Sequence, residues 1–204
     1  MTRLAPLAVF LVWLGHLHPA AAHFQEIIPD RDVLPEGGQV TLDLVFTHPF
    51  AGGPVMPMAR PLSVGGLAGG VQTDLTHRLI EVPQQGVPAW QISHDLPEPG
   101  AAIFHVTPAP YWEAAEGKFI QHHAKVITDS FASGEGWDAL VGLPVEIRPL
   151  TRPTGLWVGN LFSGIVLQDG QPVPFAKIEV ELVNRDGIVA PNDAFVTQVI
   201  TADA

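Results

Sequence analysis

The chain has 204 residues with 21 Asp plus Glu against 10 Lys plus Arg, and its formal net charge is −11 at pH 7. This acidic balance argues against nucleic acid and anionic membrane surfaces as partners, because both would repel the protein. The chain has no cysteine, which excludes disulfide bonds and thiolate metal sites. Any metal ion must therefore be held by histidine, carboxylate, methionine, the backbone or a terminal amine.

The first 22 residues have the pattern of a secretory signal peptide. A basic start precedes an apolar stretch from residue 4 to residue 17, and Ala20 and Ala22 occupy the small positions of a cleavage site. The apolar stretch is shorter than the roughly 20 residues of a transmembrane helix, so we expect export without membrane insertion of the mature chain. Cleavage after Ala22 would begin the mature protein at His23, whose α-amine and imidazole can chelate one transition-metal ion.

Short alternating apolar runs between turn signals predict an all-β protein. The 20 glycines and 20 prolines interrupt nearly every long helical pattern. Residues 39–48 form the clearest strand, since every second residue from Val40 to Phe46 is apolar. His48 continues this apolar face at the end of the strand, where Pro49 stops the hydrogen-bond ladder. Further strands are expected at residues 90–94, 101–107 and 118–128.

A loop rich in glycine, proline and methionine is expected over residues 50–61. Within it, Met56 and Met58 have a spacing that suits soft Cu(I) in an extended backbone. Two methionines in an apolar loop are more often packing residues. We therefore expect packing from this pair and keep copper ligation as the alternative.

The pattern changes after residue 143. Residues 144–154 are predicted to be a stiff, extended linker between an N-terminal sandwich, residues 23–143, and a second sandwich, residues 155–204. In the second part we expect a hairpin-like pair and a third strand, which are too few to close a sandwich. We therefore expect this sandwich to be partial and the chain to be a truncated form of a longer protein. The expected strands cover residues 161–167, 176–183 and 195–201, with a turn at Asp169-Gly170.

Histidines are the residues most able to carry chemistry here. His122 and His123 resemble a ligand pair, but successive side chains on a strand point to opposite faces. Parity places His122 inward with Ala124 and Val126, and His123 outward. An inward histidine is more often a satisfied core group than a ligand, so parity alone leaves the role of His122 open. His105 alternates away from its apolar neighbours and is expected to be exposed.

No motif for catalysis is visible. The chain contains no H-E-x-x-H motif, phosphate-binding loop or recognisable Ser-His-Asp arrangement. We therefore expect a protein that is not an enzyme.

Several segments together resemble a known bacterial family: Thr47-His48-Pro49-Phe50 with Gly52-Gly53-Pro54, Pro108-Ala109-Pro110-Tyr111-Trp112-Glu113, Phe119-Ile120 with His122 and Lys125, and Gly164 with Asp169-Gly170-Gln171-Pro172-Val173-Pro174-Phe175. The family comprises exported proteins identified as the periplasmic component of cobalt and nickel ABC-type uptake systems. The resemblance implies an immunoglobulin-like sandwich, then one similar to prealbumin-like and carboxypeptidase regulatory-like modules. It also implies a periplasmic location, Ni(II) or Co(II) as the ligand and membrane transporter subunits as partners.

The same resemblance implies a metal site built from His23, His48 and His122. His123 stands where the family pattern has an aromatic residue, so no role is carried over to it. The amine and imidazole of His23 with the other two imidazoles would supply four nitrogen donors, a set that suits tetragonal Ni(II) or Cu(II).

Two other functions compete with nickel or cobalt capture. A terminal histidine with a second histidine also suits Cu(II), as in a copper chaperone or a histidine-brace copper protein. Alternatively, two sandwiches could form a structural or adhesive module of the cell surface without any role for metal.

Overall fold

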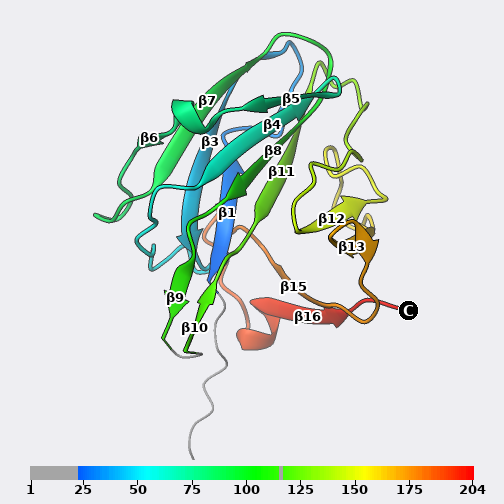
Figure 1. Ribbon diagram of the computed structural model, residues 1–204. Coiled ribbons are helices and arrows are strands. Elements are labelled where there is room, and N and C mark those ends of the chain that lie inside the picture. Colours follow the sequence, from blue (N-terminus) through cyan, green and yellow to red (C-terminus); the bar gives the residue numbers. More distant parts are fainter. Residues whose placement is uncertain (1–22, 115–116) are drawn as a thin grey trace, which may run out of the picture.

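A computed structural model describes residues 23–114 and 117–204, and the predicted signal peptide, residues 1–22, lies outside the described residues. The described part is an all-β sandwich with further small sheets beside it (Figure 1). The prediction of an all-β sandwich is therefore confirmed. Within this part, no helix is long and apolar enough to span a membrane. Its two short 3-10 helices are η1 (Thr76–Arg78) and η2 (Asp193–Phe195).

Two sheets form the main sandwich. The first is antiparallel and has the order β1-β3-β7-β6, with bounds Phe24–Pro29, Gly38–Thr47, Trp90–Leu96 and Ile80–Glu81. The second has the order β2-β11-β8-β4-β5, with bounds Val33–Leu34, Ala124–Ser130, Gly100–Thr107, Ser63–Ala68 and Val71–Asp74.

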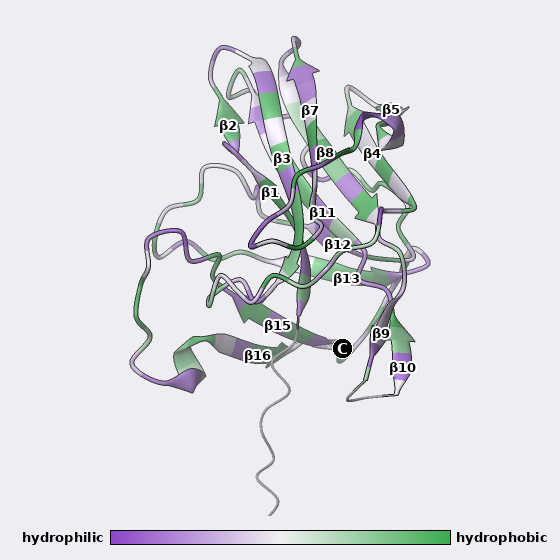
Figure 2. Ribbon diagram, turned by 90° about the vertical axis from the view of Figure 1, so that its left-hand side faces the viewer, coloured by the Kyte–Doolittle hydropathy of each residue, from purple (hydrophilic) through white to green (hydrophobic). Residues whose placement is uncertain are grey.

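The core lies between these two sheets and explains the strand pattern. Val40, Leu42 and Leu44 of β3 are fully buried, and they pack in one cluster with Phe104 and Val106 of β8. Alternation along each strand gives one apolar face to the core (Figure 2). The strand predicted at residues 39–48 is confirmed within one residue at each end, and those at residues 90–94 and 101–107 are confirmed as parts of β7 and β8.

The strand predicted at residues 118–128 is wrong in its continuity. Residues 121–123 are not in a strand; they join β10 (Lys118–Ile120) to β11. β10 pairs with β9 (Tyr111–Glu113) in a separate two-stranded hairpin. At the junction the Gln121 side chain donates to the Pro108 carbonyl at 2.7 Å, which fixes the point where the chain re-enters the sheet.

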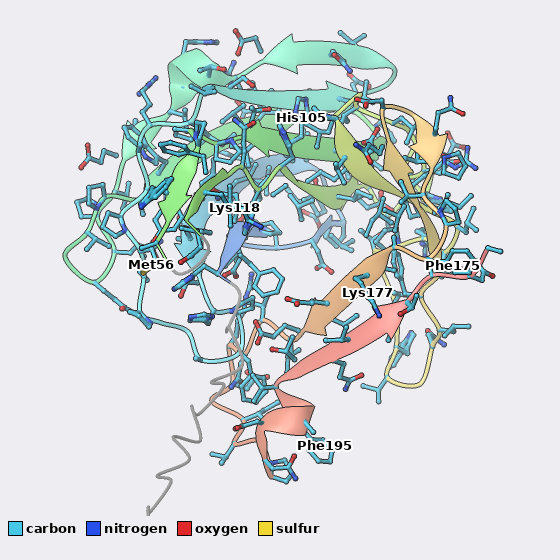
Figure 3. The ribbon with its side chains drawn as sticks, turned by 60° about the horizontal axis from the view of Figure 1, so that its bottom comes forward. Met56, His105, Lys118, Phe175, Lys177 and Phe195 are labelled. Atoms are coloured by element: carbon cyan, nitrogen blue, oxygen red, sulfur yellow. The ribbon has the colours of Figure 1, made fainter. Side chains whose placement is uncertain are left out.

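A glycine in strand β4 is required by a neighbouring side chain, and the alternation of apolar residues in the sequence does not reveal this. Gly65 lies opposite His105 of β8 in the sheet register, and a Cβ added at Gly65 would collide with the His105 ring. A residue with a side chain is thus excluded at this position unless the imidazole moves. The expectation that His105 is exposed is wrong, because the residue is half-buried and its ring lies against Gly65. Figure 3 labels this side chain.

The second part of the chain pairs differently from the prediction. The expected linker, residues 144–154, contains β12 (Val145–Pro149), which pairs with β13 (Gly164–Gln168). The turn at Asp169-Gly170 is confirmed, but it leads β13 into β14 (Gln171–Pro172). The predicted hairpin between residues 161–167 and 176–183 is wrong, because β15 (Lys177–Glu181) pairs with β16 (Thr197–Thr201) in another sheet.

The segment after β15 contacts the first sheet of the sandwich and the loop that follows β3. Asn184 donates from its backbone to the Pro49 carbonyl and from its side chain to the Phe50 carbonyl, both at 3.2 Å. Arg185 donates to the Pro29 carbonyl at 2.9 Å. The second part of the chain thus holds the loop that follows β3.

Glu26 of β1 is buried at this contact. It is 8% exposed, and within the described residues neither of its carboxylate oxygens has a hydrogen-bond partner. Burial raises its pKa from the usual 4.5 to about 7, and the charge of Glu181 adds to the shift. Burying an ionised carboxylate without a partner is costly, so the protonated form is favoured in the folded protein.

We expect this carboxyl group to make stability depend on pH. The pKa of Glu26 is higher in the folded than in the unfolded protein. Its contribution to folding stability is therefore complete below about pH 4.5 and is lost as the pH rises through about 7. Over this pH range the unfolding free energy of the wild type should fall by about 2 kcal/mol more than that of Glu26→Gln. Urea unfolding at several pH values measures the difference. Glu36→Gln, at an exposed glutamate, should follow the wild type; equal pH profiles for all three proteins would contradict the expectation.

A buried ion pair lies on the outer face of the second sheet. Lys125 Nζ lies 3.0 Å from Glu146 Oε2, and the two side chains are 10% and 4% exposed. Glu146 also accepts from the backbone N–H groups of Val141 and Gly142 at 3.3 and 3.2 Å. The carboxylate therefore joins the sheet to the segment that crosses it.

Removing one partner of this pair should be strongly destabilising, since it leaves a buried charge without its counterion. We expect Lys125→Ala to cost about 3 kcal/mol of unfolding free energy. Arg31→Ala, which breaks the exposed Arg31–Asp30 pair at 3.4 Å, should cost less than about 1 kcal/mol. Denaturant unfolding measures both losses of unfolding free energy. Equal losses for the two variants would show that burial does not strengthen the Lys125–Glu146 pair.

Candidate metal centre

The pairing of β1 with β3 brings two of the predicted histidines together. Phe24 lies opposite Thr47 in the antiparallel register, so His23, one residue before β1, comes to lie against His48, one residue after β3. Their imidazole ring centroids are 4.2 Å apart, with the ring planes tilted by 34°. His48 thus continues the apolar face of its strand, as predicted, and His23 meets it from the neighbouring strand.

Phe46 connects this pair to the third predicted histidine. Its ring centroid lies 5.6 Å from that of His23 and 5.7 Å from that of His122, whose ring meets it edge to face. His122 comes from residues 121–123, between β10 and β11. The three predicted residues therefore gather at one end of the sandwich, although they are supplied by three separate segments.

The groups around His23 shift the pKa of its imidazole. Burial lowers the pKa of its imidazole from the usual 6.5, and His48 lowers it further. The Glu113 carboxylate opposes the shift, while His122 adds to it. A lowered pKa favours the neutral imidazole, which is the form that binds metal ions.

The side chains as they lie do not already form a complete coordination site. In residues 23–114 and 117–204, no group of three or more His, Asp or Glu side chains meets the geometry of a metal site. The face of the His23 ring lies near that of His48, so at least one ring would have to turn to direct its nitrogen at a shared ion. The α-amine of His23 can serve as a donor only when the chain begins at this residue.

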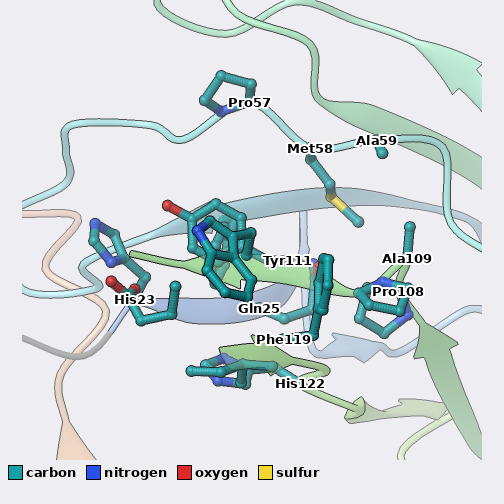
Figure 4. A pocket seen from close by; sticks show the side chains of 15 residues that line it. His23, Gln25, Pro57, Met58, Ala59, Pro108, Ala109, Tyr111, Phe119 and His122 are labelled. Atoms are coloured by element: carbon teal, nitrogen blue, oxygen red, sulfur yellow. The ribbon is translucent and has the colours of Figure 1, made fainter. Parts of the chain in front are cut away.

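A pocket of about 440 Å³ opens beside His23 and His122, and His48 is not among the residues that line it. Figure 4 shows His23 and His122 at one end of it and Pro108 and Ala109 at the other, with the Met58 side chain directed inward. Its walls are mostly apolar and aromatic, and the β9–β10 hairpin supplies a large part of them. The lining residues from β9 and β10 are Tyr111, Trp112, Glu113, Phe119 and Ile120.

Sequence reasoning missed the part that Glu113 and the hairpin take in this site. The segment Pro108 to Glu113 contributed to the family resemblance, but no role was assigned to its residues. Met58 is 5% exposed, and its carbonyl accepts from Trp90 Nε1 at 2.9 Å. Its packing role is therefore as expected, and Met56 does not line the pocket with it.

The neighbouring histidines turn away from one another, as parity predicts. His123 Nδ1 lies 3.4 Å from Thr107 Oγ1, and its ring faces a different hollow, near β12, rather than the pocket of His122. The predicted reason, alternation along a strand, is wrong, since the backbone at these two residues is not a strand.

Comparison with known proteins gives one match. A family model described as "Domain of unknown function (DUF4198)" matches residues 20–204. No curated protein and no solved structure matches the chain.

The proximity of these side chains can be tested without metal. Removing the neighbouring imidazole in His48→Ala should raise the pKa of His23, and removing the neighbouring carboxylate in Glu113→Gln should lower it further. An NMR titration of the imidazole signals measures both shifts. Glu98→Gln, at an exposed glutamate outside the pocket, serves as the control. A His23 pKa that is the same in all of these proteins would place the groups further apart than described.

Proposed function

Since this chain belongs to the DUF4198 family, whose function is unknown, we propose a function from the candidate metal centre: a periplasmic accessory protein that captures Ni(II) or Co(II). In this proposal the mature protein presents the metal to the subunits of a membrane uptake transporter. Its role is binding and delivery, without catalysis. The resemblance to periplasmic components of cobalt and nickel ABC-type uptake systems supports the same function.

The observation that carries the proposal is the meeting of His23, His48 and His122 at one end of the sandwich. Three imidazoles from three segments rarely gather by the needs of packing alone, since each brings polar atoms that must be satisfied. Imidazole and amine nitrogens suit Ni(II), Co(II) and Cu(II). Signal cleavage after Ala22 would add the α-amine of His23 and give four nitrogen donors.

The charge of the protein favours capture of cations. Its net charge of −11 raises the local concentration of divalent ions around the molecule. Glu113 supplies a carboxylate next to His23. This carboxylate would partly balance the charge of a bound divalent ion.

Copper binding is the second candidate, and Met58 is the observation that favours it. Its thioether lies on the wall of the pocket that begins at His23 and His122, and thioethers select Cu(I). The affinity of Cu(II) exceeds that of Ni(II) at most nitrogen sites, so binding strength in vitro does not identify the physiological metal. Metal analysis of the processed protein isolated from the periplasm does identify it.

Substitution of the three histidines tests the site directly. We expect the mature protein to bind one Ni(II) or Co(II) per chain, and each of His23→Ala, His48→Ala and His122→Ala to weaken binding by at least about tenfold. A chain with a long extension of neutral, non-ligating residues before His23 should also bind weakly, because its His23 nitrogen is a peptide nitrogen and its terminal amine lies remote from the site. Isothermal titration calorimetry measures each affinity.

His123→Ala is the matched control, since this neighbour faces away from the pocket, and it should bind as the wild type does. If the three variants and the extended chain retain full affinity, the proposed site is wrong. If the mature protein binds no Ni(II), Co(II) or copper, a structural or adhesive surface module replaces the proposal.

A further inference from the structure

The pocket beside the histidines is larger than a metal ion requires. Its volume of about 440 Å³ lies in the range of about 300 to 1,000 Å³ that is typical of sites for small organic molecules. A bare ion bound at His23 and His122 would fill only one end of it. The pocket also reaches Pro108 and Ala109, which lie at the end away from these histidines (Figure 4).

The walls of this space suit an apolar, flat body. Phe46, Tyr111 and Ile120 line it, with Met58 directed inward from one side. Aromatic rings pack well against other flat rings, and a thioether adapts to irregular apolar shapes. Hydrated cations would gain little from such walls, because apolar groups cannot replace the hydrogen bonds of water.

The donor set leaves room in the coordination shell. His23 with its amine, His48 and His122 supply at most four nitrogens, and octahedral Ni(II) or Co(II) takes six ligands. The remaining positions of an ion at His23 and His122 would be accessible from the pocket that these residues line. A ligand that occupies the pocket can therefore also coordinate the metal.

From these observations we infer that the protein binds its metal as a complex with a small organic chelator, whose flat apolar body fills the pocket while its donor atoms complete the coordination of the ion. This inference rests on the proposed function and names the form in which the metal is taken up. The protein nitrogens replace water on the ion, and the chelator stays bound to it. The apolar walls then select the complex over the hydrated ion.

Two model chelates of equal donor type separate this inference from metal binding in general. The 1:1 complexes of Ni(II) with 2,2′-bipyridine and with ethylenediamine have the same charge and both chelate through two nitrogens, but only the first has a flat aromatic body. We expect the mature protein to bind the bipyridine complex at least about tenfold more tightly than the ethylenediamine complex. Calorimetry with both complexes, with Ni(II) alone and with bipyridine alone measures the preference.

Filling the pocket should remove the preference and keep the metal site. In Ala109→Trp, the new indole would occupy the end of the pocket remote from the histidines, so binding of Ni(II) alone should persist while the two complexes bind equally. Ala59→Trp, at an exposed residue of the wall, gives the same test with less risk to folding. Ala194→Trp, in the exposed helix η2, is the matched control and should retain the preference.

The outcomes distinguish the two proposals. If Ni(II) alone binds and the bipyridine complex binds no more tightly than the ethylenediamine complex, the inference is overturned and the proposed function stands. Retention of the preference in both pocket-filling variants would also overturn it. Failure of the ion and of both complexes to bind would overturn the proposed function together with the inference.

Discussion

The antiparallel register between β1 and β3 is the constraint on which the candidate site depends. It sets Ile27 opposite Leu44, and both side chains enter the buried core. Because side chains alternate with a period of two, a slip by one residue would turn the core face of β1 toward solvent. The energy of core burial thus fixes the register, and the register places His23 against His48.

The site is completed by a departure from regular sheet structure. After β8 the chain leaves the sandwich to form the β9–β10 hairpin, and it returns through residues 121–123. This excursion supplies Glu113 and several pocket walls, and its return supplies His122. A continuous strand would have provided neither the pocket nor a carboxylate beside His23. The irregular segment therefore contributes more to the site than the strands that flank it.

The second part of the chain stabilises the same end of the molecule. Asn184 holds the carbonyls of Pro49 and Phe50, directly after His48, and Glu26 lies buried in the contact with Glu181 nearby. The hydrogen bonds restrict the loop that follows a proposed ligand.

Local patterns in the sequence determined a substantial part of this description. Alternation from Val40 to Phe46 predicts β3, its inward face and the direction of His48, because a period of two is a property of the strand itself. The same reasoning predicts opposite directions for His122 and His123, but residues 121–123 do not form the strand on which it depends. The family resemblance implied that His23, His48 and His122 belong together, but the pairing that brings them close was decided only by the tertiary structure, since strand pairing depends on the summed burial of residues far apart in the chain. For the same reason the sequence did not predict that β13 pairs with β12, nor that Glu113 approaches His23.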